Sequence, residues 1–451
     1  MKTLKYILLI VLTAIGISCE NDLNIEPAQS ISTETALSSE DNIINILIGA
    51  YDEAGQGPTF GGQTQIIADL LGNSGQVGWG GSFIDPRQLN NKSILTNNVF
   101  VRDLWYNSYE IINQSNLVID NISLVTSGKA NQVEGEAKFL RALSYFDLVR
   151  LFGKQYTAGG ANSQLGVPLQ LKGIIEYAED LSIARNTVEE VYTQIINDLN
   201  EAYNKLPASN SYFVDKYAAK ALLSRVYLQQ GAYANARDAA HDVLQSSGHS
   251  LTPTFAGAFN NNVDSSEDIF AFQVTSQTGA QQLINFYASQ ANGGRQGDIT
   301  IQPGYLALFD DVANDIRDNF NYVSPDNGED LTSKYTNQFA NISMFRIAEM
   351  HLIRAEANFR EGSSLGLAPL VEINTLRARS SASPLGAVTL ALILNERELE
   401  LAFEGFFLHD YKRTQRTVAG ISFDSDSLVL PIPDLEMDTN SKMVQNPGYT
   451  N

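Results

Sequence analysis

Apolar residues recur every three to four positions along several long stretches of this chain, which is the spacing of one helix face. In the stretch 131–152 these positions are Val133, Ala137, Leu140, Leu143 or Ser144, Phe146 and Leu148. Gly153 follows as a helix terminator. The stretch 187–206 opens with Thr187 and Glu190 at capping-box spacing, and Pro207 ends it. The same pattern predicts helices at 214–230, 233–245, 343–360, 367–379 and 390–404.

The predicted helices 214–230 and 233–245 form a hairpin joined at Gly231. Its small and large residues fall at the spacing of a tetratricopeptide repeat, at Leu223, Ser224, Tyr227, Gly231, Tyr233, Ala236 and Ala240. The stretches 136–153 and 346–362 are degenerate copies of this pattern. Such hairpins bury their apolar faces by stacking on one another. We therefore predict a mainly α fold, a tetratricopeptide-like scaffold of helical hairpins.

Two stretches, 54–100 and 253–303, depart from the helical pattern. Both are rich in Gly and Asn with interspersed aromatic residues, and only 269–274 looks like a short strand. We predict long irregular loops in both stretches. Because loops of this length inside a compact domain are usually functional, we expect them to carry the ligand site.

The first residues have the pattern of a secretory signal. Lys2 and Lys5 precede an apolar run, 6–17, that is shorter than the roughly 20 residues needed to span a bilayer. Cys19, the chain's single cysteine, follows at once, although Gly16 stands where a lipobox usually has a branched apolar residue. We predict a lipoprotein signal peptide at 1–18, a diacylglyceryl anchor on Cys19 and an extended, acidic tether over 19–35. We therefore expect the protein to contact the membrane through this lipid anchor.

Composition and motifs exclude several function classes. Asp and Glu number 51 against 30 Lys and Arg, a net charge of −21, so the chain repels nucleic acid while neutral ligands are unaffected. One cysteine rules out an intrachain disulfide or a thiolate metal site. The four histidines form no HExxH motif, and neither a GxSxG nucleophile motif nor a phosphate-binding loop is present. We predict no cofactor, no metal site and no catalytic residues.

Paired carboxylates can hydrolyse glycosidic bonds, so the densest acidic group needs an interpretation. Glu396, Glu400 and Glu404 share one face of the predicted helix 390–404, with Glu398 and Arg397 beside them. We interpret them as structural residues, paired with arginines such as Arg377 and Arg379 or exposed to solvent.

A sugar ring presents an apolar face and a hydroxyl edge, which aromatic rings and amide or guanidinium groups complement. Trp105 lies on a helix and is interpreted as core, whereas Trp79 is flanked by glycines and is predicted to form a sugar platform. The candidate ligand-binding residues are Trp79, Phe83, Arg87, Asn90 and Asn91 in the first loop, and Tyr287, Gln290, Asn292 and Arg295 in the second.

Several segments, in order, resemble the SusD/RagB family of nutrient-binding lipoproteins. They are 102–120, 136–153 with GVPL at 166–169, 346–357, 373–379, 393–414 and the ending 430–449. One departure is Phe406 and Phe407, where the family often has Arg after the glycine. Together the segments cover most of the chain.

The resemblance implies one SusD-like domain over 36–451, with tetratricopeptide-like helices at about 130–250 and 343–405 and the glycan site on the two loop regions. It implies an outward-facing lipoprotein of the outer membrane that captures oligo- or polysaccharide for a SusC-type TonB-dependent transporter, without catalysis. The acidic residues after Cys19 resemble the export signal of such lipoproteins. We expect a neutral glucan, such as a β-glucan, because of the net negative charge. A peptide ligand, as for RagB-type relatives, and a purely structural or adhesive role are the alternatives.

Overall fold

The computed structural model of the protein describes residues 33–176, 180–278 and 281–450. The predicted signal peptide 1–18, Cys19 and most of the predicted tether 19–35 lie outside the described residues. The tether was expected to be extended up to residue 35, whereas its last residues belong to the short helix α2 (Thr33–Ala36).

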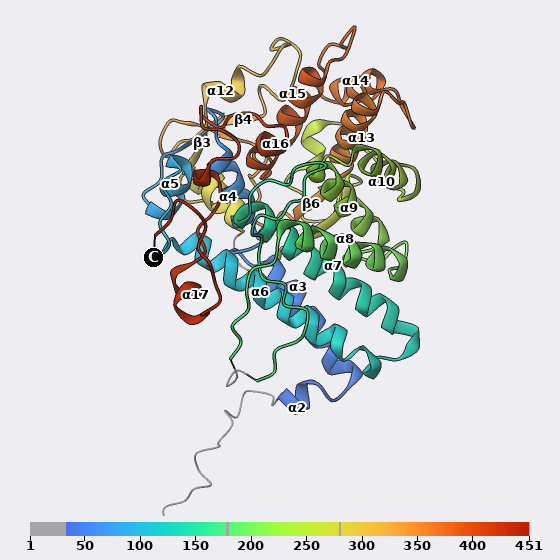
Figure 1. The fold of residues 1–451 in the computed structure, drawn as a ribbon. Helices are drawn as coiled ribbons and strands as arrows, with labels where there is room; N and C mark the ends of the chain where they lie inside the picture. Colours follow the sequence, from blue (N-terminus) through green and yellow to red (C-terminus); the bar gives the residue numbers. More distant parts are fainter. Residues whose placement is uncertain (1–32, 177–179, 279–280, 451) are drawn as a thin grey trace, which may run out of the picture.

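The helices of the scaffold follow one another along most of the chain. They are α3 (Glu40–Gly55), α6 (Val99–Asp120), α7 (Ser127–Phe152), α8 (Val188–Lys205), α9 (Lys216–Gln230), α10 (Tyr233–Ser246), α13 (Ile347–Glu361), α14 (Pro369–Arg379) and α15 (Leu390–Leu401). Each of α7 to α10 packs against the helix before it, and α13 packs against α10, α14 and α15. In Figure 1 this series runs from α6 and α7 up to α13 and α14. The prediction of a mainly α fold is confirmed.

Shorter elements lie beside this series. They are α4 (Gln63–Gly72), α5 (Ile84–Asn91), α11 (Gln282–Tyr287), α12 (Pro303–Leu306), α16 (Phe407–Arg413), α17 (Asp434–Thr439) and the 3-10 turns η2 (Ile122–Leu124), η3 (Phe255–Ala258), η4 (Gln290–Asn292) and η5 (Asp426–Leu428). The strands are β1 (Val77–Trp79), β2 (Asp268–Phe272), β3 (Ile299–Ile301), β4 (Asn321–Val323), β5 (Asp330–Thr332) and β6 (Ile342–Arg346). They form the antiparallel pairs β1–β3, β2–β6 and β4–β5. In the described part of the chain, no helix is both long and apolar enough to cross a bilayer.

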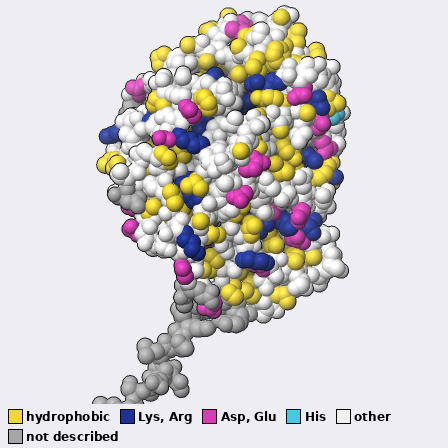
Figure 2. Space-filling model, in the orientation of Figure 1, with side chains coloured by type: hydrophobic (Ala, Val, Ile, Leu, Met, Phe, Trp, Pro, Cys, Tyr) yellow, Lys and Arg dark blue, Asp and Glu magenta, His cyan; other side chains and the backbone are white. Residues whose placement is uncertain are grey.

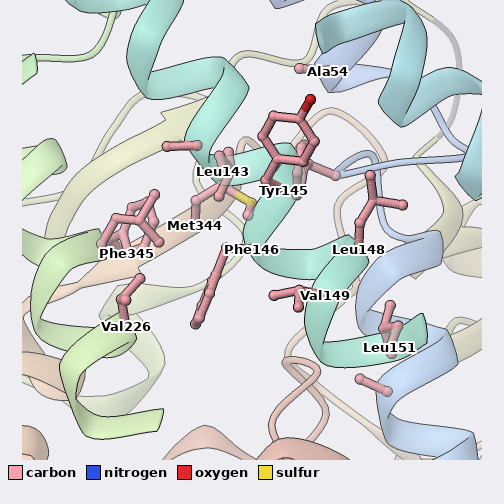
Figure 3. Close-up of a cluster of buried hydrophobic side chains, with 14 of the residues drawn as sticks. Ala54, Leu143, Tyr145, Phe146, Leu148, Val149, Leu151, Val226, Met344 and Phe345 are labelled. Carbon is pink, nitrogen blue, oxygen red and sulfur yellow. The ribbon is translucent and has the colours of Figure 1, made fainter. Parts of the chain in front are cut away.

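Helix α7 lies at the centre of the core. Its residues from 135 to 149 are all buried, because α3, α6 and α8 pack around it. Figure 3 shows Phe146 of this helix near Val226 of α9 and Met344 of β6. All the apolar positions predicted for this helix are buried.

The predicted helix ends are confirmed where the sequence supplies a defined cap. The Thr187 side chain accepts from the Glu190 N–H, and the Glu190 carboxylate accepts from the Thr187 N–H, which completes the capping box of α8. Gly231 ends α9 with φ 74°, a left-handed conformation that favours glycine. Local hydrogen bonds of this kind depend on few residues, so the sequence predicts them well.

Several predicted boundaries differ from the structure, and both stretches predicted as irregular loops contain short helices and strands. Residues 343–346, expected to begin a helix, belong to β6, which pairs with β2, and α14 and α15 are shorter than predicted. The stretch 54–100 contains α4, β1 and α5, and the stretch 253–303 contains β2, α11 and β3. Helix α4 is buried on every side, so it has no polar face to give a 3.6-residue period.

Candidate functional site

The two glycine-rich stretches meet where β1 pairs with β3. Trp79 lies opposite Ile299 and Val77 opposite Ile301, and the Gly80 N–H donates to the Asp298 carbonyl at 2.8 Å. This pairing joins segments that are more than 200 positions apart in the sequence. The expectation that both stretches contribute to one region therefore has a structural basis in this strand pair.

Four aromatic rings gather beside this strand pair. Phe286 of α11 is 3 % exposed and forms the centre of the group. The ring centroids of Trp79 and Phe100 lie 5.7 Å from that of Phe286, and the centroid of Phe83 lies 6.1 Å away. Tilted and edge-on rings at these distances attract one another. Phe83 is 41 % exposed, so its ring is available to solvent.

Two arginines lie in the same stretches as these rings, and one of them contacts a ring. The Arg295 guanidinium carbon is 3.9 Å from the centroid of the Phe83 ring, and its Nε donates to Asp298 at 2.9 Å. Arg87 is exposed and its Nη2 donates to the Gly81 carbonyl at 2.9 Å. We call Trp79, Phe83 and Phe100, with Arg87 and Arg295, the aromatic surface. It offers ring faces and guanidinium donors side by side.

The Trp79 side chain is less exposed to solvent than the sequence indicated. Its flanking glycines suggested that nothing buries it locally, yet it is half-buried because β3 and Phe286 cover part of the ring. A Cβ at Gly81 would lie 2.6 Å from Trp79 Cζ2, so the glycine lets the indole lie against the chain. Only part of this ring can face a ligand.

The prediction for Tyr287 is wrong. Tyr287 is 1 % exposed, and its hydroxyl donates to the Asp69 carboxylate at 2.9 Å. The neighbouring Phe286, also buried, packs against the rings of the aromatic surface instead, because successive residues of a helix point about 100° apart. Burial raises the pKa of Asp69 to about 7, although hydrogen bonds from Tyr287 and Gly405 oppose the rise.

The four remaining candidates lie at the edges of this region. Asn90 is half-buried, and its Oδ1 accepts from Asn73 Nδ2 at 2.8 Å, whereas Asn91 is exposed at the end of α5. Gln290 and Asn292 lie in η4, where the Gln290 N–H donates to the Asp326 carboxylate at 2.7 Å. These four residues make no described contact with the aromatic rings and stay predictions.

Three further residues of the site were not predicted from the sequence. Phe286 orders the rings, Phe100 lies in the first turn of α6, and buried Asp298 holds Arg295. The only sequence signal was the presence of aromatic residues within or next to the glycine-rich stretches. Their spatial neighbours depend on the β1–β3 pairing, which no local pattern indicates.

The dense carboxylates of α15 are structural, as the sequence suggested. Glu396 is buried and pairs with Arg317 at 2.6 Å and Arg377 at 3.3 Å, and Glu400 pairs with Arg379. Burial opposes ionisation, yet the arginines hold the pKa of Glu400 well below its ordinary value. A permanently ionised carboxylate cannot act as a general acid.

No cluster of three or more acidic, histidine or cysteine side chains suited to a metal ion occurs among the described residues. On the face shown in Figure 2, acidic and basic side chains are interspersed rather than gathered into a patch of one sign. The net charge of −21 is therefore not concentrated on this face.

Two family models match the chain. Residues 23–228 match a family described as "Starch-binding associating with outer membrane", and residues 317–425 match the SusD family. Among curated proteins, a SusD-like protein from Formosa agariphila is 26 % identical over 98 % of this chain and 98 % of its own. A SusD-like protein from Bacteroides ovatus is 24 % identical over 66 % of this chain and 63 % of its own.

Solved structures show the same fold. A SusD superfamily protein from Bacteroides thetaiotaomicron superposes with a TM-score of 0.81 at 24 % identity, covering 91 % of this chain and 100 % of that one. A laminarin-binding SusD-like protein superposes with a TM-score of 0.74 at 23 % identity, with the same coverage. The matched segments, the relatives and the fold agree: the chain belongs to the SusD/RagB family.

Proposed function

We propose that the protein binds an oligo- or polysaccharide at the aromatic surface and delivers it to a partner TonB-dependent transporter. The observation that carries the proposal is the exposed Phe83 ring held beside Arg295 and Phe286. The ring face can cover the C–H face of a sugar while guanidinium groups donate to its hydroxyls. Members of this family bind ligands without catalysis, and the chain is not an enzyme.

The ligand that we favour is a neutral glucan such as a β-glucan. A net charge of −21 disfavours polyanionic glycans, whereas an uncharged chain pays no such repulsion. The structural relative that binds laminarin, a neutral β-glucan, supports this choice. Arg295 is already paired with buried Asp298, so it acts as a hydrogen-bond donor more than as an unpaired charge.

Isothermal titration calorimetry on the purified protein tests this proposal. The panel contains laminarihexaose, maltohexaose, a fructan oligosaccharide, a uronic oligosaccharide and a mixture of short peptides. We expect one neutral glucan to bind and Phe83→Ala to weaken that binding about tenfold, since aromatic contacts contribute roughly 0.5–1.5 kcal/mol each beyond their area. The matched control is Phe359→Ala, which removes an aromatic ring that is 36 % exposed on α13. Binding of peptides without any glycan would support the RagB-like alternative instead.

We also propose that Cys19 carries the lipid that anchors the protein on the outward face of the outer membrane. The family description of association with the outer membrane supports this localisation. Two acyl chains on one residue anchor a protein stably, whereas a single chain binds marginally. Mass spectrometry of the mature N-terminus should show an acylated cysteine, and Cys19→Ala should release the protein from the membrane. A mature chain that keeps residues before Cys19 would contradict the proposal.

The partner transporter is proposed from the family alone. A permanent complex of this kind buries roughly 2,000 Å² or more. Co-purification of a large outer-membrane protein with the tagged chain from its native membrane tests the partnership.

A further inference from the structure

A pocket of about 280 Å³ lies beside β2, the loop before α9 and the second half of α3. Its aromatic wall contains Tyr212, which is 54 % exposed, and Phe213, whose ring centroid lies 4.6 Å from that of Tyr212. Tyr51 packs on the other side of Phe213, with 5.0 Å between the centroids. Buried Phe272 also lines the pocket. An exposed ring above an apolar floor is the arrangement that small-ligand pockets use.

A buried amide lines the same pocket. Gln281 is 6 % exposed and its Nε2 donates to the Ala340 carbonyl at 2.8 Å, which fixes the orientation of the amide. Its Oε1 has no hydrogen-bond partner among the described residues. A buried acceptor without a partner costs roughly 1–3 kcal/mol, and Gln281 also lines a neighbouring pocket together with Ala340.

The rim supplies further polar groups suited to hydroxyls. Asp52 is exposed on α3, and Gln56 Nε2 donates to its carboxylate at 3.2 Å. Both side chains line the pocket, and both are polar, unlike the rings of the aromatic wall. The pocket thus combines ring faces with one carboxylate and three amides, those of Gln56, Gln273 and Gln281. The polar groups of the rim can bind the hydroxyls of a neutral sugar ring whose apolar face lies on the aromatic wall.

A series of contacts along α11 connects the pocket to the aromatic surface. A Cβ on Gly57, which lines the pocket, would lie 2.7 Å from Gln282 Nε2. Asn285 Nδ2 donates to Gln282 Oε1 at 3.2 Å, and the Asn285 carbonyl accepts from the Arg295 N–H at 3.0 Å. Arg295 in turn stacks on Phe83. Two half-buried amides therefore lie between the pocket and the aromatic surface.

We propose that this pocket is a second subsite, which binds a pyranose ring of the same glycan chain that the aromatic surface binds. The Tyr212 ring covers the apolar face of the sugar, and the Asp52 carboxylate on the rim accepts from one of its hydroxyls. The inference rests on the proposed function, because it extends a glycan that the aromatic surface already holds. With two subsites, the affinity for the glycan rises with chain length until both subsites are filled, which a single surface would not produce.

Calorimetry with laminaritriose and laminarihexaose, and with maltotriose and maltohexaose in parallel, measures this length dependence. Tyr212→Ala removes the ring, and Ile48→Trp fills the pocket from α3, where Ile48 lines it and is 48 % exposed. We expect each variant to lower the affinity for the bound hexaose about tenfold and to leave the affinity for the triose unchanged. Phe359→Ala is the matched control, and thermal unfolding verifies that each variant is folded.

The outcomes separate this inference from the proposed function. If the wild-type protein binds none of the glycans in the panel, the proposed function fails and the second subsite fails with it. If the hexaose binds and Phe83→Ala weakens it, but Tyr212→Ala and Ile48→Trp bind it like the wild-type protein, only the second subsite is overturned. Equal losses of affinity for triose and hexaose in both variants also overturn it. So does the finding that the pocket binds a protein side chain while the affinity for the glycan stays unchanged.

Discussion

The Arg295 guanidinium lies over the Phe83 ring, with 3.9 Å between its central carbon and the ring centroid. Phe83 precedes α5, and Arg295 precedes β3, so one contact joins two segments that are far apart in the sequence. Asp298 accepts from Arg295 Nε and sets the position of the guanidinium. The orientation of the exposed ring therefore depends on an ion pair in the other segment.

Arg295→Ala should weaken glycan binding about tenfold, because Phe83 loses its support and the ligand loses a donor. Arg295→Lys should restore the charge near Asp298 but only part of the affinity, since an ammonium group lacks the planar guanidinium face. Calorimetry measures both variants. Arg237→Ala is the control, because Arg237 pairs with Asp238 on α10. Equal affinity of Arg295→Ala and the wild-type protein would remove Arg295 from the site.

Gly81→Ala should reduce binding by moving Trp79. The added Cβ would lie 2.6 Å from Trp79 Cζ2 and 2.7 Å from Asp298 Cγ, distances that force one of the side chains to shift. We expect a loss of binding together with about 1–3 kcal/mol of stability, from overpacking. Gly128→Ala, in the first turn of α7, is the control because nothing lies within 4 Å of its added Cβ. Intrinsic tryptophan fluorescence follows the indole, and an unchanged spectrum with unchanged affinity would refute the argument.

The sequence predicted the scaffold better than the site for a physical reason. Helices α7, α8, α9 and α10 carry their own apolar period and caps, so each is specified by neighbours in the chain. Helix α4 is buried on all sides and includes polar residues, so no periodic signal distinguished it from a loop.

At the site, residue types were predictable but their partners were not. Phe83 and Arg295 were both expected from their surroundings in glycine-rich stretches, and the structure brings them into contact. Tyr287 was predicted as a site residue and Phe286 was not. They are successive residues of helix α11, which was not predicted, so their side chains point in different directions. The free acceptor on Gln281 depends on the Ala340 carbonyl, a contact across the fold.

Removing Glu400 should destabilise the protein strongly. Glu400 is buried and contacts Arg379, Arg346 and Arg317, so Glu400→Gln leaves three buried arginines with fewer anions. Breaking a buried ion pair by removing one partner typically costs roughly 3–5 kcal/mol. Urea unfolding measures the loss, and Glu361→Gln at the exposed end of α13 is the control. A loss of unfolding free energy below about 1 kcal/mol would mean that Glu400 and its three arginines do not stabilise the fold as one network.

The same carboxylate predicts part of the acid response. Burial opposes ionisation, but the three arginines lower the pKa of Glu400 below its ordinary value of 4.5. A carboxylate with a lowered pKa in the folded state stabilises it above the unfolded pKa, and this contribution is lost as the pH falls below that value. Urea unfolding between pH 6 and 3 should therefore show a smaller loss of stability for Glu400→Gln than for the wild-type protein. Parallel pH profiles of the two proteins would contradict this.

We predict that Asp69 makes the stability of the fold depend on pH with the opposite sign, at higher pH. It is fully buried, with Tyr287 and Gly405 donating to Oδ2, while Oδ1 has no partner among the described residues. Burial raises the pKa of Asp69 from 3.8 to about 7, so between these values the folded state holds a proton that the unfolded state has released. Stability is then fully present below pH 3.8 and is lost as the pH rises through 7, at about 1.4 kcal/mol per pH unit.

Asp69→Asn should remove this dependence, because the amide is neutral at every pH and its oxygen still accepts from Tyr287. Between pH 5 and 8 we expect the wild-type protein to lose roughly 2–3 kcal/mol more than the variant, measured by urea unfolding at each pH. Taking the difference between two proteins that differ at one position cancels the titration of the other groups. If both profiles run parallel, Asp69 is ionised throughout this range, and the unpartnered Oδ1 must then be satisfied by water.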